Sequence, residues 1–133
     1  MTFAYLRITG EDMEPEDITL RLRLEPDTVQ KKGQEIAARH GWLGEGEYQS
    51  DCWQFSIESE ESESVAALTD RFLDLLLPRA EHLRELAEQF AAELYISVYP
   101  ESRQESFLFG VQTSRKLADI GLPLYFCTTY LGE

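Results

Sequence analysis

The sequence has no long apolar run. A helix that crosses a bilayer needs about 20 consecutive apolar residues, whereas the longest apolar cluster, Phe72 to Leu77, contains Asp74 and ends at Pro78. The first residues also lack a basic start followed by an apolar stretch, which is the mark of a secretory signal. We therefore expect a cytoplasmic protein with no membrane partner.

Cysteine and histidine, which often serve as nucleophiles and metal ligands, are scarce, with 2 residues of each type. Cys52 and Cys127 each lie in an apolar, strand-like segment, so we expect buried, reduced thiols rather than a disulfide. His82 has Glu85 at helical spacing, and His40 has no visible acid–base partner. A zinc or di-iron site needs three or four converging ligands. The sequence therefore predicts no metal, no cofactor and no enzymatic activity.

Basic residues are few. Lys and Arg number 12 against 25 Asp and Glu, which gives a net charge of −13. Acidic residues crowd segment 11–17, and eight more lie between Arg39 and Arg71 with no Lys or Arg among them. Nucleic acids and anionic lipid surfaces bind through cations, so neither is expected as a partner. An acidic surface attracts basic proteins, although the charge can also serve solvation alone.

The 133 residues suffice for one domain, and a single compact domain is expected over 1–133. Alternation of apolar and polar residues predicts strands, and apolar residues at helical spacing predict amphipathic helices. The predicted strands are 2–10, 53–57, 94–98, 107–111 and 124–131. The predicted helices are 65–77, 80–90 and 113–120, and 25–51 is predicted to be a loop.

Segment 15–24 fits either kind of element. Pro15 suits the first turn of a helix, whereas Ile18, Leu20, Leu22 and Leu24 alternate as in a strand. Mixed elements around one sheet indicate an α+β fold. We expect a mainly antiparallel sheet of about four to five strands with helices packed on one face, and a ferredoxin-like tendency.

Several segments together carry a family resemblance. They are Ile8–Asp12, Glu14–Ile18, Leu24–Pro26, Lys32-Gly33, Trp53 within its apolar strand, Leu76–Pro78, and Arg115–Gly121 leading into Leu124. In this combination the chain resembles a bacterial family catalogued as domain of unknown function 4279, over nearly its whole length. The resemblance implies a small α+β domain and favours a helix over residues 15–22. It implies no activity, cofactor or catalytic residue.

The charge pattern leads to a functional hypothesis. We expect a non-catalytic protein-binding module whose acidic surface engages a basic partner. By analogy with small bacterial domains that neutralise toxins, its most specific form is an immunity-type inhibitor, whose carboxylates mimic the phosphates bound by a basic toxin or nuclease. The expected electrostatic contacts are Glu45, Glu47, Asp51, Glu58, Glu60 and Glu61, with Trp42 and Tyr48 as apolar anchors.

A second candidate surface follows from the strand pattern. If the aliphatic residues of the strands face the helices, the opposite sheet face is lined by Phe3, Tyr5, Arg7, Tyr95 and Tyr99. Aromatic residues and Arg are enriched where proteins meet partners, so this face is expected to bind a protein or a second copy, unless loop 25–51 packs over it. There are two rival hypotheses. One is a self-associating structural domain. The other is a small-molecule-binding domain or minor enzyme, with a pocket between loop 25–51 and the sheet that is lined by Trp42, Trp53 and the tyrosines.

Overall fold

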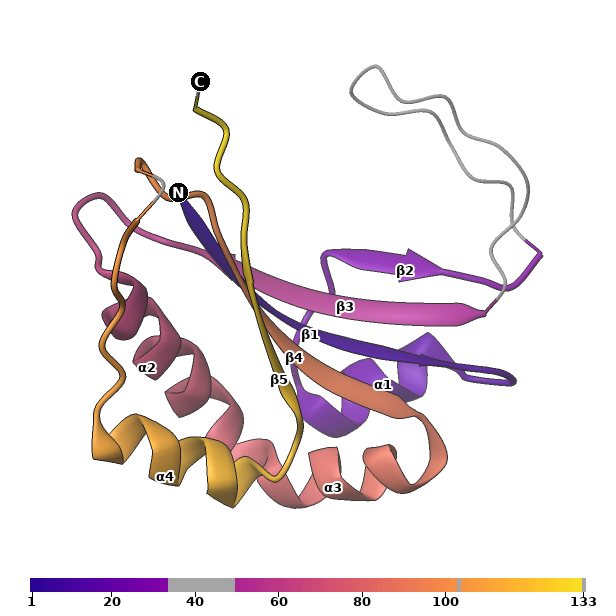
Figure 1. Ribbon diagram of the computed structural model, residues 1–133. Helices are drawn as coiled ribbons and strands as arrows, with labels where there is room; N and C mark the ends of the chain where they lie inside the picture. The colour runs from indigo at the N-terminus through magenta and orange to yellow at the C-terminus, as the bar shows by residue number, and fades with distance from the viewer. Residues whose placement is uncertain (34–49, 103, 133) are drawn as a thin grey trace.

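Five strands form one mixed sheet in the computed structural model, which describes residues 1–33, 50–102 and 104–132 (Figure 1). The strands are β1 (Thr2–Gly10), β2 (Thr28–Gln30), β3 (Asp51–Glu58), β4 (Ala91–Val98) and β5 (Leu124–Thr128), in the spatial order β2-β3-β1-β4-β5. The central strand β1 is antiparallel to both of its neighbours, β3 and β4, whereas β5 is parallel to β4. The α+β prediction is confirmed. The ferredoxin-like tendency is not.

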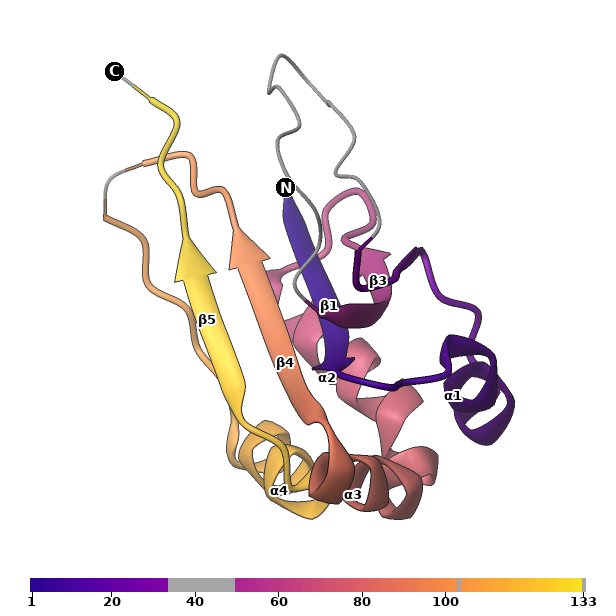
Figure 2. The same cartoon turned by 90° about the vertical axis from the view of Figure 1, so that its right-hand side faces the viewer.

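The helices cover one face of the sheet, as Figures 1 and 2 show. They are α1 (Pro15–Leu22), α2 (Val65–Leu76), α3 (Ala80–Gln89) and α4 (Val111–Ile120). A short 3₁₀ turn, η1 (Leu77–Arg79), joins α2 to α3 at Pro78, because proline removes a backbone donor from a helix interior and breaks it. Helix α4 packs mainly against α2 and α3. The resulting molecule has two layers, one of strands and one of helices.

The hydrophobic core lies between these layers. Alternate residues of β1 and β4 point into it, and Leu6, Ile8, Leu94 and Ile96 have no exposed surface. Phe72 of α2 packs against them from the helix side and is also fully buried. Full burial of such a side chain stabilises the fold by roughly 1.5–3 kcal/mol. Because side chains alternate along a strand, the residues between them are left on the opposite face. None of the described helices packs on this face, which is here called the open face.

Helix α1 settles the ambiguity of segment 15–24. Pro15 occupies its first turn, and the buried Ile18 and Leu22 lie one turn apart on the side that faces the core. Leu20, which strand alternation would place beside them, is 75% exposed. The helix ends at Leu22, and the capping residue Arg23 has a left-handed backbone with φ 56°. Segment 15–24 fits both the strand period of two and the helical period of 3.6 residues, and burial against the core selects the helix.

Two sequence predictions for strands need correction. Residues 107–110 have no regular structure, and Val111 already begins α4, because Phe107 and Phe109 turn their rings onto Phe126 instead of pairing in the sheet. The last strand ends at Thr128, three residues before the predicted end. In the other direction, the segment predicted to be a loop contains the short strand β2, paired with β3.

Candidate functional site

The turn between β3 and α2 carries three of the predicted contact residues. Glu58, Glu60 and Glu61 are exposed there, at the end of β3 that lies beside Phe3. The backbone that holds them is ordered by the neighbouring residues: Thr2 and Ser59 exchange two hydrogen bonds, of 3.2 and 2.9 Å. This set of three carboxylates is called the acidic turn below.

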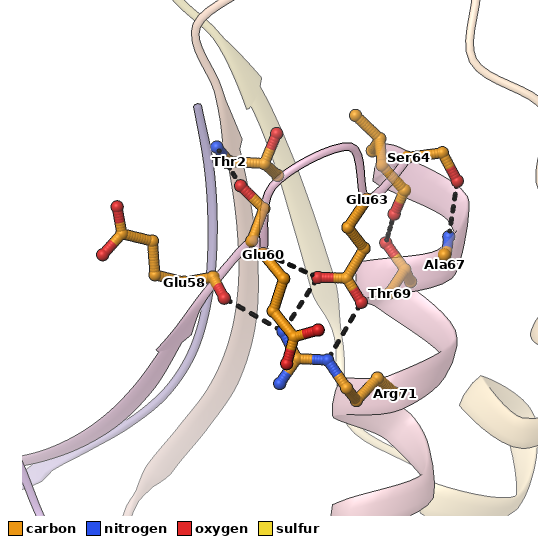
Figure 3. A network of polar contacts seen from close by, with 10 residues as sticks. Thr2, Glu58, Glu60, Glu63, Ser64, Ala67, Thr69 and Arg71 are labelled. Atoms are coloured by element: carbon orange, nitrogen blue, oxygen red, sulfur yellow. Dashed lines mark hydrogen bonds and ion pairs between the residues drawn. The ribbon is translucent and has the colours of Figure 1, made fainter.

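Arg71 of α2 fastens the acidic turn to the helix (Figure 3). Its Nε and Nη2 atoms donate to the two carboxylate oxygens of Glu63, both at 2.9 Å, and Nη2 also donates to the carbonyl oxygen of Glu58 at 2.9 Å. A bidentate arginine–carboxylate pair of this type constrains the relative orientation of the two side chains and also adds a favourable charge–charge interaction. Glu60 adds a Coulombic attraction that contributes to raising the pKa of Arg71, after the larger effect of the Glu63 hydrogen bonds.

Glu63, in the same acidic run, has a structural role. The hydrogen bonds from Arg71, followed by one from the backbone N–H of Glu60, lower its pKa to about 2. Its side chain is 12% exposed. The adjacent Ser64 caps α2 by accepting from the N–H of Ala67 at 3.0 Å, which satisfies a donor that a helix start leaves free. The run therefore contains both structural polar groups and exposed carboxylates.

Asp51 lies at the other end of β3 and is buried, with 4% exposure. Its carboxylate accepts from the backbone N–H groups of Lys32 at 2.7 Å and of Met13 at 3.0 Å, and Lys31 Nζ lies 3.8 Å away. The hydrogen bonds from Lys32 and Met13 lower its pKa. The prediction of Asp51 as an exposed contact needs correction, because its oxygens already bind internal donors.

Strand geometry separates the predicted contacts. Asp51 and Glu58 are seven residues apart on an extended strand, which puts them about 23 Å from each other at roughly 3.3 Å per residue. They therefore cannot belong to one small patch. The remaining predicted contacts, Glu45 and Glu47, and the predicted anchors, Trp42 and Tyr48, lie outside the residues that the structure describes.

A second acidic region lies at the opposite end of β1. Its exposed members follow the strand and enter α1: Glu11, Asp12, Glu14, Glu16 and Asp17. Lys32 pairs with Glu11 at 2.8 Å, and the early acidic residues favour the start of α1 through the helix dipole. The sequence already marks this segment as acidic, but its distance from the acidic turn is a consequence of the fold.

The open face carries a row of stacked tyrosines. The ring centroids of Tyr5 and Tyr95 are 4.7 Å apart, and those of Tyr95 and Tyr125 are 5.0 Å apart. Phe3 and Tyr99 meet edge to face at 6.5 Å. All four aromatic residues predicted for this face lie on it. Tyr125 was missed, because its face depends on the parallel register that places it beside Tyr95.

A hollow of about 300 Å³ lies on the open face beside this row. Tyr5, Arg7 and Tyr99 line it together with polar residues of β3 and β4. The Nε atom of Arg7 is buried and has no hydrogen-bond partner within the described part of the chain. The guanidinium also interacts with the side chains of Cys52 and Tyr95. Since buried polar atoms are normally paired, the unpaired Nε beside the hollow marks Arg7 as a candidate contact for a ligand.

Three other predicted residues can now be placed. Cys52 is buried as expected, but the prediction for Cys127 was wrong, because β5 is the last strand of the sheet and leaves this thiol exposed. Trp53 does not line the open face. It is buried on the helix side, where its Nε1 donates to Thr19 Oγ1 at 3.0 Å.

The described residues contain no group of three or more His, Cys, Asp or Glu that could hold a metal ion. His82 and Glu85 lie 3.9 Å apart on an exposed face of α3. Among the same residues, every helix is too short or too polar to cross a bilayer.

The fold and these surfaces define a small α+β domain with an acidic turn and an open aromatic sheet face. The family model described as Domain of unknown function (DUF4279) matches residues 1–131, so the chain belongs to this family. The resemblance found in the sequence is thereby confirmed. No curated protein and no solved structure matches the chain.

Proposed function

We propose that this chain is a non-catalytic, cytoplasmic protein-binding module whose acidic surface engages a basic partner. In its most specific form it is an immunity-type inhibitor, whose carboxylates take the place of phosphates in the site of a basic toxin or nuclease. The observation that supports the proposal best is the acidic turn, in which Glu58, Glu60 and Glu61 are exposed on an ordered backbone.

The local charge balance favours attraction of a cation. Arg71 is the basic residue that reaches the turn, and its guanidinium already binds Glu63 and a backbone carbonyl. Glu58 and Glu61 therefore keep their charge available for a partner, while Glu60 also attracts Arg71. A fixed cluster of like charges raises the association rate of an oppositely charged protein and loses much of this effect at high salt.

Charge reversal tests this proposal. The variant Glu58→Lys, Glu60→Lys, Glu61→Lys leaves Glu63 and Arg71 in place, and its matched control is Glu81→Lys, Glu85→Lys, Glu88→Lys on the exposed side of α3. Both variants change the net charge equally. We expect the wild-type chain and the α3 variant to retain a basic protein from cytoplasm at low salt, and the turn variant to bind it at least about tenfold more weakly.

The measurement is affinity capture with mass spectrometry at two salt concentrations, followed by titration of the captured protein. Equal loss of binding in both variants would mean that net charge alone matters, and it would remove the acidic turn as the site. Binding that resists both salt and charge reversal would contradict an electrostatic mechanism altogether.

A small-molecule-binding function is a second candidate, and the hollow beside Arg7 favours it. An arginine next to stacked tyrosines suits a small carboxylate or phosphate that carries an aromatic ring. Screening such compounds by thermal shift should give a rise of a few degrees for a ligand near saturation. The rise should vanish in Arg7→Met and persist in the control Arg115→Met, which changes an exposed arginine on α4.

A further inference from the structure

Strand β5 ends the sheet, and none of the described strands pairs with its outer edge, beside which the connection from β4 to α4 runs (Figure 2). Two hydrogen bonds fix which of its backbone groups are used: Leu94 N–H donates to the Pro123 carbonyl, and Thr129 N–H donates to the Val98 carbonyl, both at 2.9 Å. Odd-numbered residues of β5 therefore point their backbone groups toward β4. Because these directions alternate along a strand, Leu124, Phe126 and Thr128 point theirs toward the outer edge.

This edge lacks the features that usually protect one. Proteins discourage unwanted strand pairing with charged side chains, proline or bulges on the edge strand. From Gly121 to Gly132 the chain has no charged residue, and no proline after Pro123. Tyr125 is 47% exposed, and Phe126 stays 38% exposed although Phe107 and Phe109 contact its ring.

The opposite edge of the sheet differs on each of these points. Strand β2 has three residues, it is preceded by Pro26 and Asp27, and it is followed by Lys31 and Lys32. It therefore offers a short and charged edge of the protected kind. The two edges of one sheet are thus built differently, and β5 is the edge suited to pairing.

The absence of charged residues on β5 and the negative charge of the whole chain indicate which partner pairs with this strand. A basic partner is attracted to carboxylates, and β5 itself carries none. Two copies of a chain with a net charge of −13 repel each other, so they can approach most closely where both surfaces are neutral. An uncharged strand with free donors and acceptors is also self-complementary under a two-fold axis.

We propose that the chain forms a dimer in which β5 pairs antiparallel with β5 of a second copy. The two-fold axis passes beside Phe126, the middle residue of the strand, so that Leu124 lies opposite Thr128 of the second copy. All three outward-pointing residues then form hydrogen bonds across the axis. The two sheets become one continuous sheet, and Tyr125 lies opposite Cys127 of the second copy on the open face.

Substitution of Thr128 tests the interface. Thr128→Pro removes, in each copy, a backbone N–H that points toward the outer edge and forms no hydrogen bond to β4. Thr128→Val keeps this N–H and has a side chain of similar shape. Sedimentation from about 1 to 100 μM covers the range in which a modest interface dissociates. We expect a dimer for the wild-type chain and for Thr128→Val, and at least about tenfold weaker dimerisation for Thr128→Pro.

Thr128→Lys provides a second variant that retains the N–H and adds a charge to the edge, and it is expected to weaken the dimer as well. Circular dichroism and thermal unfolding establish that each variant is folded. A wild-type chain that sediments as a monomer over the whole range would overturn the proposal. So would a dimer that folded Thr128→Pro and Thr128→Lys leave unchanged.

Cysteine cross-linking tests the register. Residues 125 and 127 of the two copies form a non-hydrogen-bonded pair in the proposed dimer, with Cα atoms about 4.5 Å apart, which is within the range that a disulfide bridges. Tyr125→Cys should therefore form a covalent dimer with the exposed Cys127 under mild oxidation. The control Tyr125→Ser and the wild-type chain should not. Absence of the Tyr125→Cys cross-link, or equal cross-linking of the wild-type chain, would overturn this register.

Discussion

The two ends of strand β3 carry carboxylates in opposite situations. At one end Asp51 is buried and accepts hydrogen bonds from two backbone N–H groups. At the other end Glu58 and Glu61 are exposed, while Glu63 between them and α2 binds Arg71. All of these residues belong to one acidic stretch of sequence. The charge of a segment therefore does not reveal which carboxylates stabilise the fold and which are available to a partner.

Truncation of Asp51 is expected to give the largest effect on stability. Asp51→Ala leaves the N–H groups of Met13 and Lys32 without their acceptor in a buried place, and unpaired buried donors are strongly unfavourable. We expect the melting temperature to fall by roughly 5–10 °C, measured by calorimetry. The control Glu58→Ala should change it little. If both substitutions lowered the melting temperature equally, the carboxylates at the two ends of β3 would not differ in their contribution to stability.

Removal of the Arg71 guanidinium should have a smaller effect. Arg71→Met keeps most of the side-chain length but removes both bonds to Glu63 and the bond to the Glu58 carbonyl. The arginine side chain is 35% exposed, so water replaces part of what is lost. We expect a decrease in melting temperature of roughly 3–5 °C. Proteolysis within the turn should also become faster, because the bonds that order its backbone are gone.

Acid should weaken the turn through Glu63. Its folded-state pKa of about 2 lies below the ordinary value of 4.5, so the folded state favours the ionised form. This stabilisation is complete above the unfolded pKa, and it is lost as the pH falls from about 4.5 through about 2. Urea midpoints measured over this range should fall less steeply for Glu63→Gln than for the wild-type chain. Asp51 also titrates with a lowered pKa, so a remaining slope is expected in the variant.

Neutralisation of the exposed carboxylates should have the smallest effect on stability. Glu58→Gln with Glu61→Gln removes charge where the described residues form no ion pair with either side chain. We expect a melting temperature within about 2 °C of the wild-type value. The same double variant should bind a basic partner more weakly if the proposed function is correct. A large loss of stability would assign these carboxylates to the fold.

Much of the architecture was predictable because it depends on local periodicity. The alternation in residues 2–10 and 94–98 gave β1 and β4, and the apolar stripe of 65–77 gave α2. The prediction was wrong where apolar alternation served a different purpose. Phe107 and Phe109 alternate as in a strand, but they pack as single rings on Phe126, since no neighbouring strand is paired with them in the described structure.

The candidate site was less predictable than the fold. The aromatic face was anticipated from alternation within β1 and β4, whereas Tyr125 required the register between β4 and β5. The sequence does not distinguish the buried Asp51 from the exposed carboxylates near it, because its hydrogen-bond partners Met13 and Lys32 are remote in sequence. Asp51 is buried because the connection between β1 and α1 and the segment that follows β2 both pack against the start of β3.

The class of fold, the excess of negative charge and the scarcity of metal-binding residues can all be established from the amino-acid sequence. These follow from composition and from periods of two or 3.6 residues, which are local properties of a chain. The burial of Asp51, the attachment of the acidic turn to Arg71 and the place of β5 at the edge of the sheet depend on tertiary packing. The physical reason is that burial, ion pairing and strand order depend on contacts between residues far apart in sequence, and these contacts exist only once the sheet and helices have packed.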